Sequence, residues 1–141
     1  MTPIQIALTL FVVLETLNVV ILYFFPKTTK GNGLGVFKAV DNLDQASGLL
    51  VSYLTNWVAG TKVIFIGLIL VVLVFASNQV QLYTSVFLIP AIATFYWRLY
   101  PLAKEMDDKD LLQPKGYSKT LGLMIGVILI VLAGAIGLTV L

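Results

Sequence analysis

One carboxylate, Glu15, interrupts the long apolar run over residues 2–25, and Asn18 follows it by about one helical turn. An ionised group at the middle of a membrane helix costs about 3 kcal/mol on insertion scales, so Glu15 should face protein or water. There it could bind a proton or a cation, or contact a lipid headgroup. Since a helix turns about 100° per residue, Asn18 lies on the same face. Alternatively, a protonated Glu15 would only fix helix packing through a hydrogen bond.

Three further residues are expected at the cytoplasmic membrane interface. Lys62 lies near the start of a second apolar run, where its ammonium group can extend to the headgroup region. Trp97 and Arg98 lie near the end of a third apolar run, a position typical of interfacial aromatic and basic side chains. No residue of the chain is assigned a catalytic role.

Small residues recur along the last apolar run at separations of four, seven and four, and these are Gly122, Gly126, Ala133 and Gly137. Such spacing places them on one face of a helix, and the first two form a G-x-x-x-G pair. The face permits a close approach of another helix. The partner is expected either within the same bundle or in a second subunit.

The composition indicates an integral membrane protein. Of 141 residues, 59% are hydrophobic and only 11% are charged, and the mean hydropathy is +0.98. The chain has no Cys and no His, which argues against thiol, zinc, haem and Ser-His-Asp chemistry, so we expect no cofactor and no metal. A net charge of +2 is too small to indicate nucleic acid as a partner.

The pattern predicts an all-α fold in a single transmembrane domain over residues 1–141. Four membrane-spanning helices are expected, over residues 3–25, 57–76, 80–100 and 120–141. Between the first two, apolar residues alternate at spacings of four and three over residues 36–57, which predicts an amphipathic helix. Whether it continues into the second spanning helix stays open.

The positive residues predict the orientation. All nine Lys and Arg flank the first and third connections, and none lies near the ends or the second connection. Since positive residues are retained on the cytoplasmic side, this multi-pass chain should have both termini on the non-cytoplasmic side.

Residues 38–42, with sequence Lys-Ala-Val-Asp-Asn, faintly resemble a motif of the membrane-associated eicosanoid and glutathione metabolism family, Arg-Ala-x-x-Asn-x-x-Glu. Residues 114–117, Pro-Lys-Gly-Tyr, resemble a segment before the last helix of some members. The resemblance implies a trimer that binds glutathione and a lipid. Lys38 stands where that family has Arg, and Gln45 where it has Glu.

Three functions therefore compete. The first is a small non-enzymatic membrane subunit that packs with itself or with other membrane proteins in the lipid bilayer. The second is a small oligomeric transporter or channel, linked to protons or cations through Glu15. The third is the glutathione- and lipid-binding protein that the resemblance implies.

Overall fold

The computed structural model describes residues 1–140, and within them the chain is helical with no β-strand. The α-helices are α1 (Pro3–Phe24), α2 (Gln45–Phe75), α3 (Asn78–Asp108) and α4 (Tyr117–Val140). Each is long and apolar enough to cross a bilayer, which requires about 20 residues. The expected all-α fold, with four helices long and apolar enough to span a membrane, is confirmed.

Side chains at the first residues define where three helices begin. Thr2 and Gln5 form a reciprocal capping box at α1. Asp44 accepts the amide N–H groups of the first turn of α2, and Ser77 does the same for α3. These groups satisfy backbone donors that have no partner inside a helix.

The structure does not show the amphipathic helix predicted over residues 36–57. The short 3-10 segments η1 (Leu34–Val36) and η2 (Lys38–Asn42) take its first part, and Asp44 then starts α2. Its second part is the beginning of α2, which continues without a break into the predicted second spanning helix.

Backbone bonds to the other charged connection explain this difference. The N–H of Lys38 donates to the carbonyl of Leu111, and the N–H of Gln113 donates to the carbonyl of Val36. The N–H of Lys38 and the carbonyl of Val36 are therefore paired with the other connection and not within an α-helix. Local periodicity carries no information about a partner so distant in sequence.

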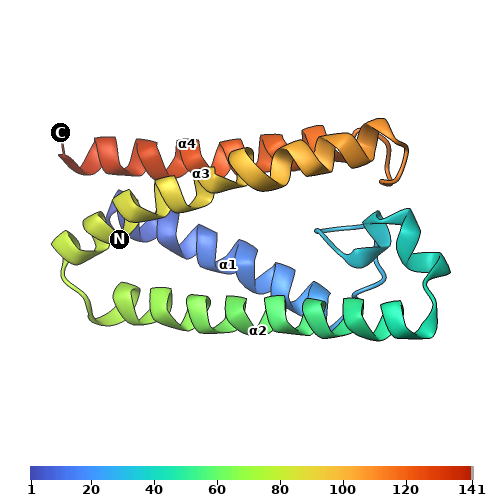
Figure 1. Cartoon of the computed structure of the whole chain (residues 1–141). Helices are drawn as coiled ribbons and strands as arrows, with labels where there is room; N and C mark the ends of the chain where they lie inside the picture. Colours follow the sequence, from blue (N-terminus) through green and yellow to red (C-terminus); the bar gives the residue numbers. More distant parts are fainter. Residues whose placement is uncertain (141) are drawn as a thin grey trace.

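Figure 1 shows both termini and the turn between α2 and α3 at one end of the molecule, with the two charged connections at the other. The helix α1 packs along α2, and α3 packs along α4 at the connection end. Towards the terminal end α3 leaves α4, while α1 contacts α4 there. The buried core lies at this terminal end and consists of Ile4, Ala7, Leu8, Val12, Ile69, Leu88, Leu132 and Ala135.

The two charged connections pair with each other, and we call residues 35–38 together with residues 110–113 the clasp. Phe37 and Leu112 form an antiparallel bridge, and the Lys38 ammonium group lies 2.8 Å from a carboxylate oxygen of Asp110. The hydrogen bond and charge of Lys38 lower the pKa of Asp110 below its usual value. Close packing continues at Gly35, where an added Cβ would overlap the carbonyl oxygen of Lys27.

The helix α3 extends further than predicted, through Pro101 to Asp108. The missing N–H of Pro101 is tolerated, and an exposed ion pair of 2.6 Å joins Glu105 and Lys109 in the last turn. Asp107 then accepts hydrogen bonds from the backbone of Gly116 and from Ser118 at the start of α4. The polar segment between the third and fourth predicted helices therefore begins as the last turns of α3 and ends as the first turn of α4.

Candidate functional site

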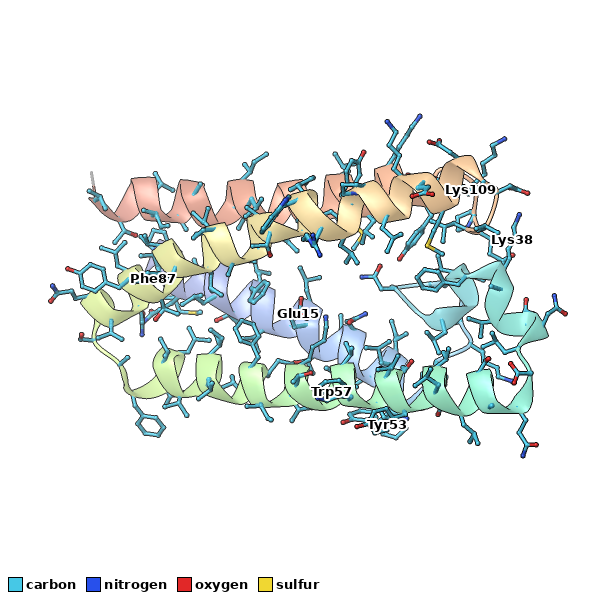
Figure 2. The ribbon with its side chains drawn as sticks, viewed as in Figure 1. Glu15, Lys38, Tyr53, Trp57, Phe87 and Lys109 are labelled. Carbon is cyan, nitrogen blue, oxygen red and sulfur yellow. The ribbon has the colours of Figure 1, made fainter. Side chains whose placement is uncertain are left out.

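An ion pair joins the middles of α1 and α2. The Nζ atom of Lys62 lies 2.6 Å from Oε2 of Glu15, and the side chains are 30% and 22% exposed. Figure 2 shows Glu15 at the middle of α1, far from both ends of the bundle. The carboxylate predicted to need shelter from lipid is thus paired with an ammonium group.

Lys62, which is predicted at the cytoplasmic interface, lies close to the midpoint of α2. This helix begins at Gln45, so Lys62 is about 26 Å from its first residue at 1.5 Å per residue. The sequence predicts a start twelve residues later, which puts Lys62 in the first turns. The partner of Glu15 was missed for the same reason.

A cavity of about 500 Å³ opens beside this ion pair, between the four helices and the first connection. Its polar lining comes from Glu15, Asn18, Asn32, Thr55, Lys62 and Tyr117. The rest of the lining is apolar and includes Leu22, Phe95 and Leu121. The cavity is therefore amphipathic, with polar groups contributed by α1, α2, α4 and the first connection.

Hydrogen bonds hold the first connection over this cavity. The amide Nδ2 of Asn18 donates to the carbonyl of Gly31 at 2.8 Å, and the Tyr117 hydroxyl donates to Oδ1 of Asn32. Asn32 has a φ of 64°, in the left-handed region that Asn tolerates better than most residues. Glu15 and Asn18 both line the cavity, in keeping with their predicted shared face. No local sequence pattern indicates Tyr117 as the partner of Asn32.

Glu15 also borders two further hollows, each of about 380 Å³. One lies between α2 and α3 and is lined by Lys62, Phe65 and Leu88. The other lies beside α3 and α4 and is lined by Arg98, Phe95 and Ile125 among others. Glu15 thus lines the cavity and both hollows.

Arg98 and Trp97 are both exposed on α3, and the Arg98 guanidinium carbon lies 5.6 Å from the centre of the Trp97 ring. No carboxylate within residues 1–140 forms an ion pair with Arg98. The helix continues for about 15 Å beyond Arg98 to Asp108. Arg98 therefore faces a hollow shared with Glu15 as a positive charge without a counter-ion in this part of the chain.

The predicted strip of small residues on α4 is divided in two. Gly122 is buried beside the ring of Tyr100, and Gly126 lies near the hydroxyl of Tyr96. Ala133 and Gly137 are exposed, because α3 has left α4 at that depth. The first two glycines therefore pack within the chain.

The arrangement provides one carboxylate, one paired ammonium group, one guanidinium group, amides and hydroxyls. Among residues 1–140 no group of three acidic, Cys or His side chains could hold a metal ion. Of the residues that carry the family resemblance, Tyr117 lines the cavity, whereas Lys38 pairs with Asp110, and Asn42 and Gln45 lie outside the lining. These groups suit binding through charge and hydrogen bonds.

Comparison with known proteins yields no matching family model, no similar curated protein and no similar solved structure.

Proposed function

We propose that this protein binds an amphiphilic small molecule inside the membrane, at the cavity beside Glu15 and Lys62. The supporting observation is that polar side chains from three helices and one connection converge on a cavity of about 500 Å³ with otherwise apolar walls. Pockets of this size, with few polar groups among apolar ones, are typical of small-molecule sites. The polar groups would orient a headgroup, and the walls would contact an alkyl chain.

The partial exposure of the ion pair supports the same proposal. Charged groups inside a bilayer avoid hydrocarbon and face protein or water-filled space. Glu15 and Lys62 retain about a quarter of their side-chain exposure, so a ligand headgroup or water has access to them. Cation transport through Glu15 has less support, since an incoming cation would have to displace the Lys62 ammonium group at 2.6 Å.

A substitution that fills the cavity should abolish this binding. Leu121 lines the cavity, whereas Leu123 on the same helix does not and is 70% exposed. We expect Leu121→Trp to weaken binding of an uncharged dansyl-labelled alkyl amide at least 10-fold, and Leu123→Trp to leave it unchanged. Fluorescence titration of the protein in lipid nanodiscs measures both. Equal affinities for the two variants would contradict the proposal.

A second candidate is the membrane subunit that the sequence favoured. The hollow beside Lys62 lies between α2 and α3, two helices that barely touch, and a helix of another chain could cover the ion pair there. Packing in membranes depends on such close contacts and on shared polar groups. The particle mass in detergent distinguishes the candidates, because a single chain has 15.4 kDa.

We also propose that the clasp is cytoplasmic and that both termini are on the opposite side. The support is that both positively charged connections lie at the same end of the bundle. Cysteines introduced at Ser77 and Lys115 should then react with an impermeant maleimide from opposite sides of intact vesicles. Labelling of both from one side would contradict the four-span orientation.

A further inference from the structure

We infer that a single-chain amphiphile with an anionic headgroup binds at a second site, with its headgroup at Arg98 and its chain in a groove between α1 and α4. This inference goes beyond the proposed function, because neither Arg98 nor the lining of this groove belongs to the cavity beside Lys62. It depends on three observations, namely the charge balance around Arg98, the continuity of the spaces, and their depth along the helices.

The charge balance favours an anion. Glu15 and Lys62 neutralise each other at 2.6 Å, and Arg98 lines a hollow with Glu15 but has no ion pair of its own within residues 1–140. One positive charge is therefore left over in this region. A guanidinium group presents a planar fork of donors that matches a carboxylate or a phosphate. An anionic headgroup would balance Arg98 without disturbing the existing pair.

A groove of about 240 Å³ between α1 and α4 provides the place for an alkyl chain. Its lining is entirely apolar and includes Leu10, Leu14, Val127 and Val131. Phe11 and Ile128 line both this groove and the hollow at Arg98. Hence the polar and apolar spaces adjoin each other along shared walls.

Along the membrane normal, Arg98 lies nearer the surface than the apolar groove, which is the order of headgroup and chain in a lipid. Arg98 lies about 30 Å along α3 from Asn78, which is about the thickness of the hydrocarbon core, and so reaches headgroup depth. The Tyr96 hydroxyl donates to the carbonyl of Gly122, which sets the level of α4 beside Arg98. From there Val131 lies about 14 Å deeper in the membrane. A chain that starts at Arg98 and enters the groove would therefore run inward, as lipid chains do.

The sign of the headgroup charge tests this inference directly. Three dansyl-labelled probes with the same alkyl chain would carry a carboxylate, a hydroxyl or an amine, and would be titrated into the full-length protein in neutral-lipid nanodiscs. We expect the carboxylate to bind at least 10-fold more tightly than the other two. Arg98→Gln should remove this preference and Arg98→Lys should retain part of it. The matched control Lys104→Gln, an exposed lysine on the same helix, should keep it in full.

The groove is tested separately with Val131→Trp, which should weaken binding of the carboxylate probe. The control is Ile130→Trp, whose site is 72% exposed and outside the groove. Equal binding of the three probes, or an unchanged preference in Arg98→Gln, would overturn the anionic headgroup. Unchanged binding in Val131→Trp would overturn the chain position. The proposed function fails only on its own result, an unchanged affinity of Leu121→Trp for the uncharged probe.

Discussion

Replacing Glu15 by Gln is expected to lower the free energy of unfolding by about 1–3 kcal/mol, as measured by thermal or denaturant unfolding in detergent. The substitution leaves the Lys62 ammonium group without the carboxylate that now lies 2.6 Å away. Breaking a fully buried pair costs about 3–5 kcal/mol, and the partial exposure of both side chains reduces that cost here. The charge-exchanged double variant, Glu15→Lys with Lys62→Glu, should recover most of the loss because it restores the pair.

The chain supplies a matched control for this experiment. Glu105 and Lys109 form an ion pair of the same length, 2.6 Å, but their side chains are 60% and 62% exposed. Exposed pairs contribute little to stability because water screens them. Glu105→Gln should therefore leave unfolding unchanged. If Glu15→Gln also left the free energy of unfolding unchanged, Lys62 would be solvated rather than dependent on Glu15.

The second large effect is expected at Gly122. A Cβ added there would lie 2.7 Å from a ring atom of Tyr100, well inside contact distance. That ring packs against Phe95 and Tyr96, with centroids 6.0 and 5.6 Å away, so it has little room to turn aside. We expect Gly122→Leu to separate α3 from α4 and to cost about 1–3 kcal/mol or more, since overpacking forces both helices to move.

Gly137→Leu is the control for this second substitution, because it makes the same change on the same predicted strip of α4. A Cβ at Gly137 would meet nothing within 4 Å. The melting temperature should fall for Gly122→Leu and stay within about 1 °C of the parent for Gly137→Leu. A fall of the same size at Gly137 would show that another surface covers this part of α4, as an oligomer would.

The helices were predictable from sequence because each depends on a local and strong signal. Long apolar runs predict membrane-spanning helices. Pro26 follows the end of α1, and the caps at Thr2 and Ser77 define the starts of α1 and α3. Residues 36–57 show the limit of such a signal. Their alternating apolar pattern is real, but the backbone of Lys38 is bonded to Leu111, and no local pattern specifies that contact.

The site was predictable only in part. Glu15 was identified because an ionisable group in an apolar run is costly by itself. Lys62 was assigned to the interface, because a long basic side chain near a predicted helix end can reach water. Its pairing with Glu15 depends on where α2 starts, which Asp44 determines by capping the helix. Tyr117 reaches Asn32 across 85 residues of chain, a contact that depends on the assembled bundle.

The clasp has a consequence for how this chain is made. The Nε2 group of Gln113 donates to the carbonyl of Gly35, 78 residues earlier, so the donor emerges from the ribosome well after the acceptor. At about 5–20 residues per second, the delay is roughly 4–16 s. During that interval α2 and α3 are synthesised, while the carbonyls of Gly35 and Val36 have no protein partner and depend on water. The connection between α1 and α2 must therefore stay hydrated until the connection between α3 and α4 is synthesised. The second connection then forms the clasp by pairing with the first at the same end of the bundle.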